Sequence, residues 1–208
     1  MKIVKIYLVR HGQTEWNKQK RYQGSKDIGL DNTGLDQAEK LAEKLKNIQW
    51  SKVYSSDLQR ARKTAETVAS KCNFEIPILE VPELREMHFG DWEGQTFTSI
   101  EEQFPEKVNA FFADPTPQII PAGENAESFR ERVLKGFEEI LTNSSAGDVV
   151  LAVTHGGTIR VIVCEVMGLP LKDMWEIEQG NTAINILGIG KDGKMTFESV
   201  NDTSHLKL

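Results

Sequence analysis

The chain has 208 residues, of which 39% are hydrophobic and 27% are charged. This length suits one domain with a core of its own, and this composition excludes a disordered chain. The formal net charge of -6 argues against nucleic-acid or anionic-membrane partners, although a local cationic pocket can still bind an anionic substrate.

The cysteines and the N-terminal stretch bear on where the protein works. Cys72 and Cys164 have neither a paired nor a metal-binding spacing, so we expect both to be reduced core residues of helices. The apolar start is short and runs directly into Arg10 and His11, unlike a signal peptide, and no apolar run is long enough to span a bilayer. These features predict a cytoplasmic protein.

The first half of the chain alternates between strand and helix patterns. Residues 3–9 are apolar and branched, which predicts a buried strand, and residues 52–55 predict a second, shorter one. Residues 33–46 carry an apolar stripe at helical spacing. Another helix follows the second strand, and Ser56 with Gln59 has the pattern of a capping box at its start. The positions expected to be buried are Leu35, Ala38, Leu41, Ala42 and Leu45 in the first helix, and Leu58, Ala61, Ala65, Val68 and Cys72 in the second.

The second half continues this alternation. The spacing of apolar residues predicts a helix over 129–141, a fully apolar strand over 149–154 and a buried helix over 159–167. Residues 184–189 and 195–200 predict a hairpin that turns at residues 191–193. The G-x-G-x-x-G pattern at this turn is followed by a strand and not by a helix, so it does not indicate a dinucleotide site.

Together these elements predict an α/β fold, because strands that alternate with helices pair in parallel through right-handed crossovers. We expect a three-layer sandwich with a mostly parallel sheet and helices on both faces. The segment at about 89–124 breaks the pattern, since it holds six aromatic residues and four prolines. We interpret it as a small helical cap inserted into a single domain of residues 1–208.

The candidate functional residues lie where predicted strands end. Arg10 and His11 follow the first strand, Arg60 lies in the first turn of the helix after the second, and His155 follows the apolar strand. Ligands of open α/β sheets bind at the carboxyl ends of the strands, where free backbone N–H groups of helix starts favour anions. Each residue alone is typical of a structural position, but their convergence favours an anion site that pairs the buried cations.

Other chemistries lack their patterns in this sequence. There is no G-x-S-x-G elbow of a serine hydrolase and no G-x-x-x-x-G-K-[ST] phosphate loop. The histidines, which are His11, His88, His155 and His205, show no H-x-H or H-x-x-x-H spacing of a metal site. The sequence therefore predicts no metal and no cofactor.

Four ordered motifs resemble those of the histidine phosphatase superfamily, which has the phosphoglycerate-mutase-like fold. They are residues 8–17 (LVRHGQTEWN), 55–65 (SSDLQRARKTA), 84–94 (LREMHFGDWEG) and 154–157 (THGG). The resemblance covers nearly the whole chain and is nearest to the broad-specificity and alpha-ribazole phosphatases. It implies that the protein hydrolyses small phosphorylated metabolites through a phosphohistidine.

The resemblance also implies a role for each site residue. His11 would attack phosphorus, and Arg10, Arg60 and His155 would hold the phosphoryl oxygens. Glu86 would donate a proton to the leaving group. The residues that would line the phosphate pocket are Asn17, Gln23, Gly24 and Gly156. No metal is needed in this scheme, because guanidinium groups compensate the oxygen charge, and His88 receives no role beyond a structural one.

Two alternatives stay open beside a phosphatase. A cofactor-dependent phosphoglycerate mutase shares the phosphate pocket but needs further cations for a carboxylate. Residues 88–125 offer one basic residue, Lys107, against seven acids, which favours a phosphatase. Outside that segment, the candidates to bind a carboxylate are Lys18, Lys20, Arg21 and Lys26. A non-catalytic phosphate-binding protein is disfavoured because every expected catalytic position is filled. Neither the natural substrate nor the oligomeric state follows from the sequence.

Overall fold

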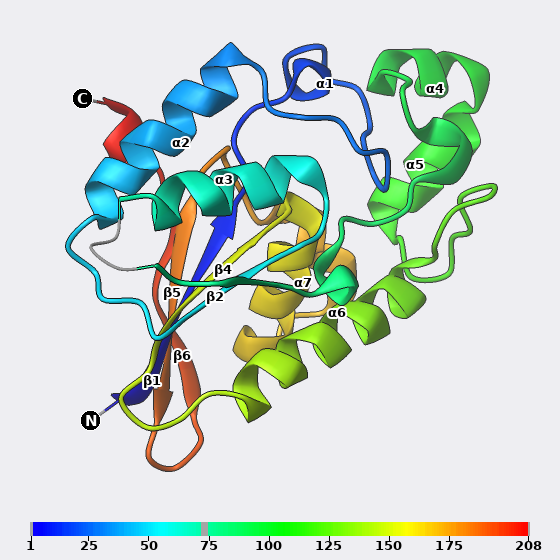
Figure 1. Ribbon diagram of the computed structural model, residues 1–208. Helices are drawn as coiled ribbons and strands as arrows, with labels where there is room; N and C mark the ends of the chain where they lie inside the picture. The colour runs from blue at the N-terminus through cyan, green and yellow to red at the C-terminus, as the bar shows by residue number, and fades with distance from the viewer. Residues whose placement is uncertain (1, 72–74, 208) are drawn as a thin grey trace.

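The computed structural model describes residues 2–71 and 75–207, and in these residues a six-stranded sheet lies between two layers of helices (Figure 1). The strands are β1 (Lys2–Arg10), β2 (Lys52–Ser55), β3 (Ile78–Glu80), β4 (Val149–Thr154), β5 (Ile184–Gly190) and β6 (Met195–Asp202). Their order is β3-β2-β4-β1-β5-β6. The first four of this order pair in parallel, whereas β5 is antiparallel to both of its neighbours. The prediction of a mostly parallel sheet is confirmed.

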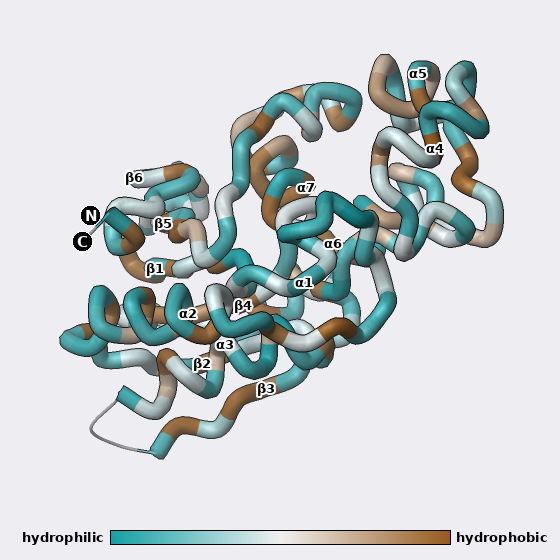
Figure 2. Tube along the Cα trace, turned by 90° about the horizontal axis from the view of Figure 1, so that it is seen from above, coloured by the Kyte–Doolittle hydropathy of each residue, from teal (hydrophilic) through white to brown (hydrophobic). Residues whose placement is uncertain are grey.

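Helices cover both faces of the sheet, as the view from above shows (Figure 2). The helices α2 (Asn32–Leu45) and α3 (Gln59–Ala69) pack together on one face, and α6 (Ala126–Thr142) and α7 (Gly156–Met167) pack on the other. Side chains alternate along β1, so Leu8 joins the core cluster of α6 and α7 while Val9 joins that of α2 and α3. The three-layer prediction is confirmed.

The strand register brings the expected site residues to one edge of the sheet. Arg10 in β1 lies opposite Thr154 in β4, and Ser55 in β2 lies opposite Val153 in β4. These three neighbouring parallel strands therefore end side by side. The residues that follow them are His11, Ser56 and His155.

The segment at 89–124 forms the expected helical cap, with α4 (Phe97–Gln103) and α5 (Pro105–Ala113) beyond this edge of the sheet (Figure 1). Its apolar side is continuous with the main core, because Trp92 and Phe111 are buried in the same cluster as β1. The two rings meet edge-on, with centroids 5.3 Å apart. The assignment of residues 1–208 to a single domain stays a prediction.

Several short elements were not expected from the sequence. The helix α1 (Glu15–Lys18) and the strand β3 have four and three residues, too few to show a periodic pattern. The chain also forms the 3-10 turns η1 (Pro82–Leu84), η2 (Gly90–Trp92), η3 (Leu171–Glu176) and η4 (Ser204–Lys207). None of the helices in residues 2–71 and 75–207 is both long and apolar enough to cross a membrane.

Two sequence predictions about helices are wrong. The capping box at Ser56 does not form: α3 begins after Leu58 without a side-chain cap, and the Ser56 hydroxyl lies 2.9 Å from Nε2 of His155 instead. Leu35 is 39% exposed because it lies at the margin of the buried face of α2. The expectation for Cys72 lies outside the described residues, whereas Cys164 is a buried free thiol in α7.

Leu41 and Leu35 test this core with the same substitution in the same helix. Leu41 is fully buried, so Leu41→Ala should lower the free energy of unfolding by about 2–5 kcal/mol through lost burial and a cavity. Leu35→Ala should change it by less than about 0.5 kcal/mol. Urea unfolding measures both, and equal effects would contradict the assignment of the buried face.

Candidate active site

A cavity of about 180 Å³ lies at the carboxyl edge of the sheet, beneath the cap. Its lining residues are Arg10, His11, Asn17, Arg21, Tyr22, Gln23, Gly24, Arg60, Glu86, Phe89, Arg160 and Trp175. Most of the residues expected from the sequence are thus brought together. His155 and Gly156 flank the cavity: the rings of His11 and His155 have centroids 5.1 Å apart, and Gly156 lies against the Arg10 side chain.

His11 is held as a neutral imidazole. It is 2% exposed, and its Nδ1 lies 2.6 Å from the carbonyl oxygen of Gly12. Because a carbonyl only accepts, Nδ1 carries the proton and Nε2 keeps its lone pair. Burial, followed by the positive charges of Arg60 and Arg10, holds the pKa of His11 well below its usual value. A nucleophilic nitrogen is therefore available at neutral pH.

Arg60 and Arg10 bring positive charge to the cavity, and in the part of the chain that the structure describes neither forms a direct ion pair with a carboxylate. Arg60 is fully buried and donates from Nη1 and Nη2 to the carbonyl oxygens of Lys26 and Gly24, at 2.7 and 2.8 Å. Arg10 donates from Nη1 to the carbonyl oxygen of Gln179 at 2.6 Å. Within the described residues, both buried Nε atoms lack a hydrogen-bond partner.

Desolvation affects both guanidinium groups. Burial lowers the pKa of Arg10 to about 10, with a further contribution from Arg160, and burial lowers the pKa of Arg60 to about 10. Both remain protonated at neutral pH. Buried cations with unpartnered N–H groups favour an anion in this cavity, since an anion supplies the missing acceptors.

Arg160 is a further guanidinium of the cavity, beside those of Arg10, Arg21 and Arg60, and it was not predicted from the sequence. It lies one turn into α7, where Nε donates to the carbonyl oxygen of Ile177 at 2.7 Å and the group stacks 5.5 Å from the centre of the Trp175 ring. A Cβ at Gly156 would come within 3.0 Å of Arg160 Nη1 and 3.4 Å of Arg10 Nε. A charged residue four positions after Gly156, in an otherwise mostly apolar helix, was the available signal.

Among the described residues, Glu86 is the one carboxylate that lines this cavity. Its Oε1 accepts from the backbone N–H of Met87 at 2.9 Å, and its Oε2 accepts from that of Gly157 at 3.0 Å. The second bond ties the carboxylate to the first turn of α7, where the helix dipole favours negative charge. A Cβ at Gly157 would approach Oε1 to 2.2 Å, so only glycine leaves room for this arrangement.

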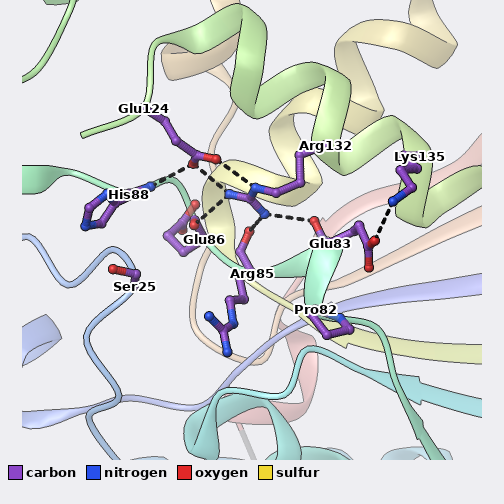
Figure 3. A pocket seen from close by; sticks show the side chains of 9 residues that line it. All are labelled: Ser25, Pro82, Glu83, Arg85, Glu86, His88, Glu124, Arg132 and Lys135. Carbon is purple, nitrogen blue, oxygen red and sulfur yellow. Dashed lines mark hydrogen bonds and ion pairs between the residues drawn. The ribbon is translucent and has the colours of Figure 1, made fainter. Parts of the chain in front are cut away.

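Glu86 also lines a second, larger cavity of about 580 Å³ (Figure 3). Its other lining residues are Ser25, Pro82, Glu83, Arg85, His88, Glu124, Arg132 and Lys135. The cations here are paired: Arg132 with Glu124 at 2.7 Å, Lys135 with Glu83 at 2.9 Å, and Arg85 with Asp57. Arg132 also donates to the carbonyl oxygen of Glu86 at 3.2 Å, which fixes the backbone at that residue.

The loop at residues 14–25 closes the cavity. The Thr14 hydroxyl donates to Gln23 Oε1 at 2.9 Å, and Asn17 Oδ1 accepts from Asn181 Nδ2 at 3.2 Å. Gly24 has a φ of +53°, and a Cβ there would meet the Glu93 carboxylate at 2.1 Å. The backbone of this loop is therefore specified by glycine.

Glu93 holds the same loop from the cap side, and its role was not foreseen. Its side chain is 1% exposed, and Oε1 accepts from the backbone N–H groups of Ser25 and Phe89 at 2.8 and 3.1 Å. His88, for which a structural role was expected, has Nε2 3.7 Å from this oxygen. The described part of the chain has no group of three or more His, Cys, Asp or Glu residues suited to a metal ion.

Comparisons with known proteins agree with this geometry. Residues 6–203 match the family model described as "Histidine phosphatase superfamily (branch 1)". A protein of Arabidopsis thaliana named "Metal-independent phosphoserine phosphatase" is 35% identical over 206 residues, which are 98% of this chain and 84% of that protein. A "Probable phosphoglycerate mutase GpmB" of Photorhabdus laumondii is 39% identical over 172 residues, or 81% of this chain and 77% of that protein.

A solved structure gives the same fold. The crystal structure of a putative alpha-ribazole-5'-P phosphatase from Escherichia coli superimposes with a TM-score of 0.87 and 27% sequence identity. The match covers 96% of this chain and 97% of that one. The sandwich and its cap are thus shared along nearly the whole chain.

The two buried imidazoles predict how stability depends on pH. Burial lowers the pKa of both His11 and His155 below the usual 6.5, so the unfolded chain binds protons that the native rings do not. This contribution is full above pH 6.5 and is lost as the pH falls, by up to about 1.4 kcal/mol per pH unit for each ring.

Urea unfolding at pH 5.5–7.5 in phosphate-free buffer measures this slope. In the double variant His11→Asn, His155→Asn, the free energy of unfolding should keep only the pH dependence that comes from His205, whose pKa is also lowered by burial. An equal slope in the wild type and the double variant would contradict the neutral imidazoles.

Proposed function

This chain belongs to the histidine phosphatase superfamily and is a phosphatase of small phosphorylated metabolites, and we propose that it works through a phosphohistidine formed on His11. The observation that carries the proposal is the pairing of two features in one cavity. Nε2 of His11 has a lone pair, and the neighbouring Arg10 and Arg60 each keep a buried N–H without a partner.

The reaction runs in two displacements. The lone pair of Nε2 forms a bond to phosphorus while the bond from phosphorus to the leaving oxygen breaks, and Glu86, in its protonated form, gives its proton to that oxygen and becomes a carboxylate. The Gly12 carbonyl stabilises the positive charge that develops on the ring, because it accepts from Nδ1. Water then attacks phosphorus, Glu86 takes its proton, and the bond to Nε2 breaks to release phosphate.

The charges of the cavity suit this chemistry. The described lining residues include four guanidinium groups, those of Arg10, Arg21, Arg60 and Arg160, and a single carboxyl group, that of Glu86. A phosphoryl dianion offsets part of this positive charge, and fixed guanidinium forks compensate the equatorial oxygens, a role that metal ions have in other phosphoryl-transfer enzymes. We propose that His155, Asn17, Gln23, Gly24 and Gly156 complete the phosphate site.

Glu86 lies where an acid catalyst is needed, because it lines both cavities. The smaller cavity holds the phosphoryl group and the nearest part of the leaving group, and the larger one extends the room for the organic moiety. The apolar wall of the smaller cavity comes from Tyr22, Phe89 and Trp175, which suits varied leaving groups.

The mutase alternative has specific observations in its favour. Arg160 and Arg21 both line the smaller cavity and offer the kind of cation that a substrate carboxylate needs. The cap supplies no lysine or arginine for this purpose, since Lys107 lies over the Phe104 ring and no lysine or arginine of 88–125 lines either cavity. We propose hydrolysis, with phosphoserine and alpha-ribazole 5'-phosphate as the first substrates to test. A cytoplasmic location and the lack of nucleic-acid and membrane partners stay predictions.

Trapping the intermediate tests the nucleophile. Brief mixing with ³²P-labelled substrate and an alkaline quench should leave label on the protein, because a phosphoramidate resists alkali. The same sample quenched in acid is the control and should lose the label. His11→Ala should retain neither label nor turnover, and near wild-type turnover in this variant would exclude His11 as the nucleophile.

Gly157→Ala tests the position of the Glu86 carboxylate. The added methyl displaces Oε1, so kcat/KM for an alkyl phosphate should fall about 100-fold while the melting temperature changes little. In a Glu86→Gln background the same change should cost almost nothing, because the displaced group no longer acts. If the two substitutions lower kcat/KM independently of each other in the double-mutant cycle, Gly157 does not act through the Glu86 carboxylate.

Product analysis separates hydrolysis from isomerisation. The protein is given 3-phosphoglycerate with a trace of 2,3-bisphosphoglycerate, and both 2-phosphoglycerate and free phosphate are followed. We expect phosphate release to exceed isomerisation, because the cap offers no cation to hold the dephosphorylated acid. Faster isomerisation would identify a mutase, and failure to turn over p-nitrophenyl phosphate as well would indicate a non-catalytic protein.

A further inference from the structure

Within the described residues, one ring nitrogen of His155 has a hydrogen-bond partner and the other has none. Its ring is fully buried, and Nε2 lies 2.9 Å from the hydroxyl oxygen of Ser56. Nδ1 is also buried but has no hydrogen-bond partner in residues 2–71 and 75–207. A buried polar atom without a partner is costly, so its existence in a well-packed site indicates a ligand that completes it.

The position of the ring proton follows from the hydrogen bonds of Ser56. Its hydroxyl oxygen accepts from the backbone N–H of Leu58 at 3.4 Å. Within the described residues, the ring nitrogen of His155 is the only acceptor bonded to this hydroxyl. The Ser56 O–H therefore donates to Nε2, and Nε2 carries a lone pair.

A neutral His155 then has its single proton on Nδ1. Neutrality is enforced by burial and by the positive charges of Arg60 and Arg10, which hold the pKa of His155 well below its usual value. Nδ1–H is thus a donor without an acceptor, in a ring whose centroid is 5.1 Å from that of His11. A phosphoryl oxygen supplies the acceptor.

We propose that Ser56 is a positioning residue that fixes the tautomer of His155, so that Nδ1–H donates to an oxygen of the bound phosphoryl group. The inference rests on the proposed function in taking phosphate as the ligand. It assigns a task to a side chain that the sequence pattern places in a helix cap. Ser56 lies 99 positions from His155 in the chain and meets it because β2 and β4 end together.

The two imidazoles of the site then acquire opposite roles while both stay neutral. The Gly12 carbonyl accepts a hydrogen bond from Nδ1–H of His11, so Nε2 keeps its lone pair and serves as the nucleophile. The Ser56 hydroxyl gives its proton to His155 and leaves Nδ1 as a donor. One acceptor and one donor from the protein thus separate a base from a hydrogen-bond donor without any difference in net charge.

Nitrogen-15 NMR of histidine-labelled protein in phosphate-free buffer tests the tautomer directly. We expect His155 to show a protonated Nδ1 and an unprotonated Nε2, and its Nδ1–H signal to shift when inorganic phosphate is added. A ligand-free His155 protonated on Nε2 would overturn the proposal. This measurement needs no turnover, so it stands apart from the test of the phosphohistidine.

Ser56→Ala and Ser55→Ala form a matched pair. Both serines are fully buried neighbours, but the Ser55 hydroxyl donates to the carbonyl oxygen of Ser56, whereas the hydroxyl that bonds to His155 is that of Ser56. Ser56→Ala should lose the fixed tautomer and bind inorganic phosphate on the order of tenfold more weakly, since a hydrogen bond to a charged group is lost. Ser55→Ala should keep the wild-type tautomer and affinity.

These measurements separate the effect of Ser56 on the His155 tautomer from the contact of His155 with phosphate. An unchanged His155 spectrum in Ser56→Ala would overturn the role of Ser56. A changed tautomer with unchanged phosphate affinity would uphold Ser56 as the residue that sets the tautomer but remove His155 from the proposed phosphate site. Equal weakening in both variants, with equally lowered melting temperatures, would show that only packing is disturbed and would overturn the proposal.

Discussion

Positive charge held away from water at one edge of the sheet is the constraint on which the rest of the site depends. Arg10, Arg60 and Arg160 converge where β1 and β4 end, and within residues 2–71 and 75–207 no direct ion pair with a carboxylate balances them. Desolvation makes such groups costly, and it shifts the pKa of each arginine downward. An anion with several oxygens relieves this cost, so the charge of the site favours a phosphoryl group.

Backbone carbonyls hold these cations without neutralising them. The oxygens of Gly24, Lys26, Gln179 and Ile177 each accept from a guanidinium nitrogen and so fix the direction of the remaining N–H groups. A carboxylate in the same positions would remove the charge that the substrate needs. This explains why loops far apart in sequence converge on the arginines, and why Gly24 adopts a conformation that favours glycine.

Hydrogen bonds and burial likewise set the protonation of the two buried histidines. In the proposed site, local hydrogen bonds with Gly12 and Ser56 set which nitrogen of each imidazole is available, while burial and the arginines keep both rings neutral. The proposed acid, Glu86, is bonded to the first turn of α7 and lines both the smaller and the larger cavity. The proposed nucleophile, hydrogen-bond donor and acid thus differ by environment and not only by residue type.

The sequence by itself determined the layers of the fold and the place of the site. Alternating buried strands and amphipathic helices require a parallel sheet, and parallel strands end at a shared edge, so Arg10, His11, Arg60 and His155 could be assigned to one pocket. These inferences need only local periodicity and the residues that come directly after a strand. The motifs then supplied Glu86 and the loop residues by resemblance.

Only the tertiary structure decided which side chains serve the site from a distance. The register of β2 and β4 turns Ser56 from an apparent helix cap into the partner of His155, and the rotation of α7 brings Arg160 beside Arg10. Glu93 reaches the loop at Gly24 from the cap across 68 positions of sequence. Such contacts carry no periodic signal, because they depend on how separate elements pack and on backbone carbonyls that every residue has.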